Sequence, residues 1–133
     1  MRTHTTRSLA AAAALAAVTG LVSTTSPAAM ANDDDRIARG SCARSTDWKV
    51  KASPENGRIE IEGEVDSSRA GQTWRWALFH NGSVSAAGSR ITRGSSGSFG
   101  VRRVSVDMGG TDTFVFRARN VRSGEVCRGS VNF

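Results

Sequence analysis

Apolar and polar residues alternate along most of this chain from residue 41 onward, and this period of two constrains the fold more than any other feature. The clearest example is residues 58–65, in which Ile59, Ile61 and Val65 alternate with glutamates. Successive side chains of a β-strand point to opposite faces of a sheet, so such alternation predicts half-buried strands. No segment shows the apolar period of an amphipathic helix. The sequence therefore predicts an all-β fold.

Turn residues divide this region into seven predicted strands. The strongest turn signal is Asn81-Gly82, because an Asn-Gly pair between alternating segments is typical of a two-residue β-hairpin. Such strands favour two antiparallel sheets packed face to face, an immunoglobulin- or fibronectin-like sandwich, and a small closed barrel is the alternative. We expect a bulge at residues 102–103, where the alternation shifts phase. The strands are expected at residues 48–52, 58–65, 73–80, 83–88, 98–106, 113–120 and 125–133.

The first 31 residues have the composition of a secretory signal peptide. Arg2 and Arg7 give a positive start, residues 9–22 carry no charge, and Ala29-Met30-Ala31 has the small-x-small pattern of a cleavage site. The apolar run is shorter than a typical membrane-spanning helix. We therefore predict cleavage after residue 31 rather than retention as a membrane anchor.

Removal of this leader would leave one small domain. Residues 32–40 are polar and contain three consecutive aspartates, so we expect a disordered lead-in. Residues 41–133 form the predicted β-sandwich domain, and no second apolar run follows the leader. The prediction is a secreted, extracellular protein that has no membrane association once the leader is removed.

Cys42 and Cys127 lie at opposite ends of the predicted domain. Two cysteines in an exported chain most simply form a disulfide with each other, and two free thiols or a bond to another chain are the alternatives. The bridge would close a loop of about 85 residues and stabilise the fold by roughly 4–5 kcal/mol in the chain-entropy treatment. Because no other metal-ligating residues cluster near either cysteine, we expect neither a metal site nor a cofactor.

Candidate catalytic residues are few. His80 is the only histidine after the leader, and a general base needs a nucleophile or a second acid beside it. Its place before the predicted turn favours a simple hairpin-end residue. The glutamates of residues 60–64 share one strand face, whereas the paired carboxylates of glycosidases flank a cleft. We expect them to form a solvated face, paired across strands with the lysines of residues 49–51. The sequence therefore predicts no enzyme and no catalytic residue.

A basic face is the main functional candidate. Four arginines occupy outward positions on the predicted third, sixth and seventh strands, because their neighbours on those strands are large apolar residues that must point inward. If these three strands share a sheet, as in the immunoglobulin topology, the arginines converge on one outer face with an aromatic residue beside them. The candidate binding residues are Arg75, Phe79, Arg117, Arg119 and Arg128.

The charge of the chain indicates what such a face would bind. Loss of the two leader arginines lowers the formal net charge from +6 to +4, and arginine pairs bidentately with phosphate and carboxylate groups. We predict a secreted, non-enzymatic binding or interaction module for an anionic wall polymer, a glycan or a protein surface. The alternatives are a small secreted enzyme inhibitor or enzyme with a loop-borne site, or an ordinary outer face on which arginine stems shield Phe79. Nucleic acid is not an expected partner, because Phe79 is the only stacking aromatic available there.

Residues 74–83 (WRWALFHNGS) and 116–129 (FRARNVRSGEVCRG) carry a resemblance to known proteins. Together with the leader and the two cysteines near the domain ends, they resemble small secreted two-cysteine β-sandwich proteins of actinobacteria. The resemblance covers most of the chain after residue 31. It implies export and an all-β fold, and it implies no activity.

Overall fold

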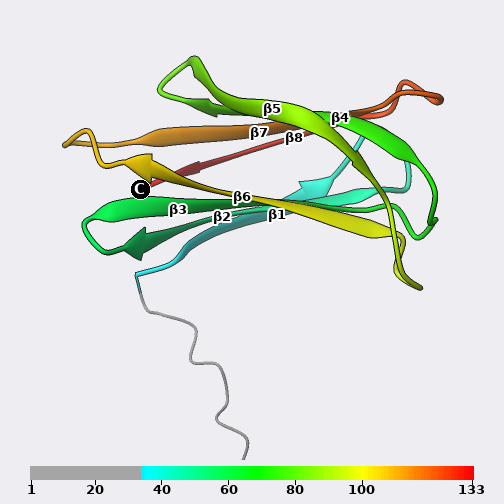
Figure 1. Cartoon of the computed structure of the whole chain (residues 1–133), viewed down its shortest axis with the longest axis horizontal. Helices are drawn as coiled ribbons and strands as arrows, with labels where there is room; N and C mark the ends of the chain where they lie inside the picture. The colour runs from blue at the N-terminus through cyan, green and yellow to red at the C-terminus, as the bar shows by residue number, and fades with distance from the viewer. Residues whose placement is uncertain (1–33) are drawn as a thin grey trace, which may run out of the picture.

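The computed structural model describes residues 34–133, which form two antiparallel sheets of four strands each and contain no helix. The order is β1-β2-β3-β6 in the first sheet and β5-β4-β7-β8 in the second, and Figure 1 shows the two sheets stacked face to face. The signal peptide predicted at residues 1–31 lies outside the described residues. The strands are β1 (Arg36–Ser41), β2 (Asp47–Glu55), β3 (Arg58–Asp66), β4 (Thr73–His80), β5 (Ser83–Ile91), β6 (Ser98–Val106), β7 (Thr113–Asn120) and β8 (Val126–Asn132).

The all-β prediction is confirmed, but residues 34–133 form eight strands rather than the seven that were expected. The additional strand β1 lies within the segment that was expected to be disordered, and it pairs with β2 from Arg36 opposite Ala52 to Ser41 opposite Asp47. Its order comes from this backbone ladder, because most of its side chains are exposed or only half-buried. A polar segment can therefore be a strand when an edge strand beside it offers unpaired N–H and C=O groups.

The core lies between the two sheets. Trp74 is completely buried, as expected for an aromatic residue on the central strand of the second sheet. Gly63 on β3 leaves room for the ring of Phe116, which reaches across from β7. The other fully or nearly buried apolar side chains are Val50, Ala52, Ile59, Ile61, Val65, Trp76, Leu78, Phe99, Val101, Phe114, Ala118, Cys127 and Val131.

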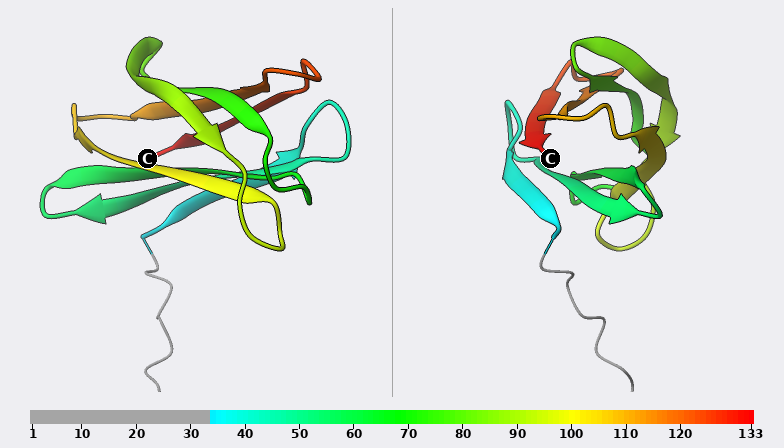
Figure 2. Two further views of the ribbon diagram at one scale, coloured as in Figure 1. Left: turned by 45° about the vertical axis from the view of Figure 1, so that its right-hand side comes forward. Right: turned by 90° about the vertical axis from the view of Figure 1, so that its left-hand side faces the viewer.

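The bulge predicted at residues 102–103 is wrong. β6 pairs with β3 without a register shift, and the irregularity lies instead between β4 and β5, at Leu78 and Phe79. The sequence alternation changes phase because Arg103 points inward, opposite the buried Ile61. Its guanidinium packs over the Trp76 ring, 5.4 Å from the centroid, and Arg103 remains exposed. The edge strands β5 and β6 run near each other on this side of the sandwich (Figure 2).

Candidate functional site

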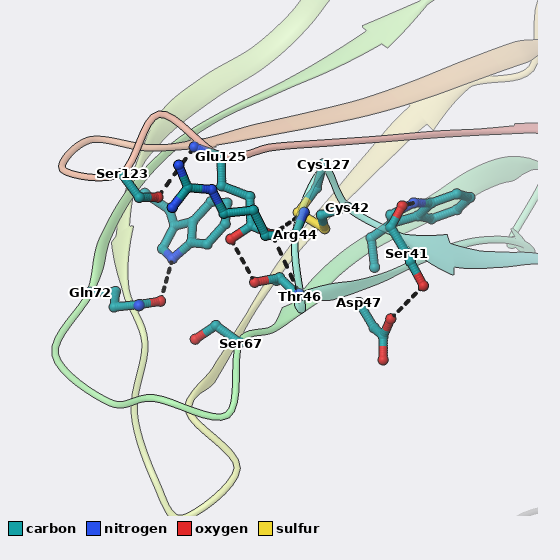
Figure 3. Close-up of a disulfide and its surroundings, with 12 residues drawn as sticks. Ser41, Cys42, Arg44, Thr46, Asp47, Ser67, Gln72, Ser123, Glu125 and Cys127 are labelled. Atoms are coloured by element: carbon teal, nitrogen blue, oxygen red, sulfur yellow. Dashed lines mark hydrogen bonds between the residues drawn. A yellow bond between two sulfur atoms is a disulfide. The ribbon is translucent and has the colours of Figure 1, made fainter.

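The predicted disulfide between Cys42 and Cys127 is present and ties the loop after β1 to strand β8. The two Cα atoms are 4.3 Å apart, and Cys127 is completely buried. The buried Glu125 reinforces this end by accepting hydrogen bonds from the Arg44 backbone N–H at 2.9 Å and the Thr46 hydroxyl at 2.9 Å. Figure 3 shows these bonds beside the disulfide. The disulfide and the hydrogen bonds of Glu125 therefore link the loop after β1 to the start of β8.

The four predicted arginines lie on the outer face of the second sheet. β4, β7 and β8 are neighbours in this sheet, which is the arrangement that the convergence of these side chains requires. Arg75 lies directly opposite Arg119, and Arg117 lies directly opposite Arg128. All four residues are exposed, whereas the residues on either side of each along its strand are buried or half-buried. We call this set of four residues the arginine face.

The arginine face is not neutralised within the described part of the chain. No ion pair of residues 34–133 includes any of its four guanidinium groups. The outward positions of the second sheet carry Ala, Ser, Thr, Val, Phe and other uncharged residues around them, and none of these positions is acidic. Since like charges placed directly opposite each other repel, this concentration of positive charge costs the folded state some stability.

The first sheet shows the opposite pattern. The expected cross-strand pairs are present there, with Lys51 Nζ 3.3 Å from Glu62 Oε2 and Lys49 paired with Glu64. Arg102 on β6 pairs with the third glutamate, Glu60. The outer face of the first sheet is therefore largely compensated in charge, and the uncompensated charge of the sandwich is concentrated on the second sheet.

Apolar residues border the arginine face at the end of β4. Phe79 is half-buried and lies opposite Val115 on one side and Val84 on the other. Val84 exposes 63 % of its surface. The structure thus brings Phe79 to the same outer face as the arginines, in the row next to Arg117, and it gives this face a mixed basic and apolar surface.

A hollow of about 650 Å³ adjoins the opposite end of the arginine face. Thr73, which precedes Arg75 on the same face of β4, contributes to its wall, and so do two further arginines, Arg69 and Arg122. Neither arginine makes an ion pair with another described residue. Positive charge therefore continues from the sheet into a concave surface at its edge.

A second group of polar side chains surrounds His80, and no pattern in the sequence indicates it. His80 Nε2 lies 2.5 Å from Asp112 Oδ1, and its Nδ1 lies 3.0 Å from the hydroxyl of Ser105. The three residues come from β4, β6 and the loop before β7, and His80 precedes Ser105 by 25 residues and Asp112 by 32 residues. His80 is the histidine that the sequence singles out, but no short motif connects it to its two partners.

Asp112 is held as a carboxylate although it is only 1 % exposed. Burial alone would raise its pKa, but hydrogen bonds from His80, the Met108 backbone N–H and the Asn81 amide outweigh burial and hold the pKa below its ordinary value. A carboxylate only accepts hydrogen bonds, so Nε2 of His80 carries the proton in this contact. In the neutral ring Nδ1 is then the acceptor, and the Ser105 hydroxyl donates to it.

Within residues 34–133 there is no group of three or more His, Cys, Asp or Glu side chains that could hold a metal ion. The same residues contain no helix long and apolar enough to cross a membrane. Comparison with known proteins found no matching family model, no matching curated protein and no matching solved structure.

Proposed function

We propose that this protein is a secreted binding module whose arginine face binds an anionic polymer that carries phosphate or carboxylate groups. The observation that carries the proposal is the placement of four exposed arginines on three adjacent strands with no acidic residue among them. Four like charges held together do not stabilise the folded state. Binding of an anionic ligand would explain their placement, whereas a contribution to stability would not. The arginine face itself carries out no reaction.

The spacing of the arginines suits a repeating ligand. Adjacent strands are about 4.8 Å apart, and residues two apart along a strand are separated by about 7 Å. The pairs Arg75–Arg119 and Arg117–Arg128 therefore form two rows about 7 Å apart on a nearly flat surface. Each guanidinium can engage one anionic group through two parallel hydrogen bonds. A linear polymer with an anion every few ångströms would contact both rows at once.

Secretion is part of the same proposal. The leader predicted at residues 1–31 supports it, and so does the disulfide, because such bonds persist in oxidising compartments. The expected product of cleavage begins at Asn32. Mass spectrometry of the culture supernatant would test this, and recovery of only full-length protein in the membrane fraction would overturn it.

We also infer a fibronectin-like arrangement for β2–β8. Counted from β2, the first, second and fifth strands share one sheet and the third, sixth and seventh share the other, which is common to immunoglobulin-like sandwiches. The fourth strand, β5, pairs with β4 rather than joining the first sheet, and this supports the fibronectin variant over the immunoglobulin constant type. β1 is an addition at the edge of the first sheet.

The test of binding uses two variants with the same loss of charge. Arg117→Ser/Arg119→Ser removes two unpaired charges from the arginine face, and Lys49→Ser/Lys51→Ser removes two paired charges from the first sheet. With polyphosphate and polyglutamate as probes, we expect the arginine variant to bind at least about tenfold more weakly and the lysine variant to bind within about threefold of the wild type. Wild-type binding should weaken steeply as salt is raised from about 50 to 300 mM, because exposed charges are screened. Equal losses in both variants would show that net charge alone is responsible and would refute a defined face.

A further inference from the structure

The hydrogen bonds around His80 run in one direction, from Ser105 through the imidazole to Asp112. The carboxylate of Asp112 accepts from Nε2–H over 2.5 Å, and the lone pair of Nδ1 accepts from the Ser105 hydroxyl over 3.0 Å. The buried carboxylate thereby sets the tautomer of the ring and leaves the lone pair of Nδ1 to accept from Ser105. This is the order of roles that activates a serine in hydrolytic triads, in which a base is in turn oriented by a third group.

The ring of His80 is fixed in position. It stacks on Phe114 with the ring centroids 4.4 Å apart, and its side chain is only 10 % exposed. Asp112 is held in turn by the Asn81 amide at 2.9 Å and by the Met108 backbone N–H at 3.0 Å. Because both the base and its partner are constrained before any ligand arrives, the cluster has the preorganisation that a reactive site needs.

Ser105 is partly exposed to solvent. It is half-buried on the inward face of β6, which is an edge strand of the first sheet. Arg103 precedes it by two residues on the same face and adds a positive charge there. Next to the imidazole, His80, Val84 and Met108 line a hollow of about 330 Å³ together with polar residues of the β4–β5 turn.

We propose that Ser105 is a nucleophile that attacks small acyl esters, with His80 as its general base and Asp112 as the residue that positions the base. The Ser105 Oγ–H proton passes to His80 Nδ1 while Oγ bonds to the ester carbonyl carbon. The carbon–oxygen bond to the leaving alcohol then breaks, and that oxygen takes the proton from Nδ1. Water then attacks the acyl ester of Ser105 and gives a proton to His80 Nδ1. Ser105 Oγ takes this proton as it leaves, which releases the acid and restores the hydroxyl.

The site is independent of the arginine face. It uses the inward side of β6 and the end of β4, whereas the arginine face lies on the outer side of the second sheet. Polymer binding and ester cleavage can therefore be lost separately, and neither proposal depends on the other.

The test treats the full chain, with its disulfide intact, with a fluorophosphonate probe and follows p-nitrophenyl acetate cleavage in parallel. We expect one adduct per molecule, located at Ser105 by peptide mapping, and none in Ser105→Ala. His80→Gln should lower the rate of labelling by about 100-fold or more. Ser130→Ala is the matched control, since Ser130 is an exposed serine on the outer side of β8, opposite Val115, and it should be labelled at the wild-type rate.

Two results would overturn the proposal. The first is a folded wild-type protein in which Ser105 remains unmodified, which would mean that the cluster only braces the end of the sandwich. The second is labelling spread over exposed serines at rates that His80→Gln does not change. The thermal unfolding of each variant is measured alongside, so that a loss of labelling through unfolding is recognised, and the wild-type labelling position decides the question even if His80→Gln does not fold.

Discussion

Arg75 on β4 lies directly opposite Arg119 on β7, so two guanidinium groups face the solvent from neighbouring strands with no acidic side chain beside them. Cross-strand partners usually attract each other or are neutral, and like charges in this position destabilise a sheet. The lysines and glutamates of the first sheet show that this chain does pair its charges elsewhere. The pair Arg75–Arg119 therefore lacks, among the described residues, the charge compensation that the lysines of the first sheet have.

The first prediction concerns this repulsion. Arg117→Ser/Arg119→Ser should leave the melting temperature within about 4 °C of the wild type or raise it slightly, because exposed charges contribute little to stability and the repulsion is relieved. Differential scanning calorimetry at low salt would measure the change. A fall of about 10 °C or more would mean that these arginines serve the fold, and the proposed ligand would lose its main support.

The second prediction concerns the disulfide. Replacing both Cys42 and Cys127 with Ser should lower the free energy of unfolding by roughly 2–5 kcal/mol, because the closed loop restricts the unfolded chain. Urea titrations of the oxidised wild type and the double variant provide the measurement. Reduced wild-type protein is the matched control and should behave like the variant. Equal stability of all three forms would contradict a structural role for the bond.

The alternation of residues was sufficient to predict the all-β class, the core on β4 and the outward direction of Arg75, Arg117, Arg119 and Arg128. These features follow from local chemistry, because a strand with large apolar residues on one face must turn its charges to the other. The convergence of the four arginines depended in addition on the order of the strands, which alternation does not encode.

Three other features depend on tertiary contacts and were missed for that reason. β1 has few apolar side chains and is ordered by its ladder to β2. Arg103 breaks the alternation because its guanidinium packs over the Trp76 ring while the residue remains exposed. Ser105 and Asp112 meet His80 only because β6, the loop before β7 and the end of β4 come together. A lone histidine in a sequence carries no information about partners that the fold brings from elsewhere.

The third prediction concerns Gly63. A Cβ atom added there would overlap the ring of Phe116, which is completely buried and cannot move aside. Gly63→Ala should therefore lower the free energy of unfolding by about 1–3 kcal/mol through overpacking. Gly100→Ala on the neighbouring strand is the matched control, because the nearest atom to its added Cβ is 3.9 Å away, and this change should have little effect. Denaturant titrations of both variants would show whether the two substitutions differ.

The fourth prediction concerns acid stability. Hydrogen bonds hold the pKa of Asp112 below its ordinary value of about 3.9. As the pH falls below about 4, the unfolded chain therefore binds a proton at this residue while the native state does not. Proton binding stabilises the unfolded state relative to the native state, so the free energy of unfolding falls. The contribution of Asp112 to stability is complete above about pH 4 and is lost as the pH falls through the lower, folded-state pKa.

Asp112→Asn should remove this part of the acid sensitivity and lower the free energy of unfolding at neutral pH by about 2 kcal/mol, because hydrogen bonds to a charged acceptor are replaced by weaker ones. Asp107→Asn, an exposed aspartate in the same loop, is the matched control and should keep the wild-type pH dependence. Thermal unfolding between about pH 2 and 7 would measure all three proteins. If the melting temperatures of the wild type and Asp112→Asn changed with pH in parallel, the neighbours of Asp112 would not be lowering its pKa. The direction of the hydrogen bonds from Ser105 to Asp112 would then be wrong.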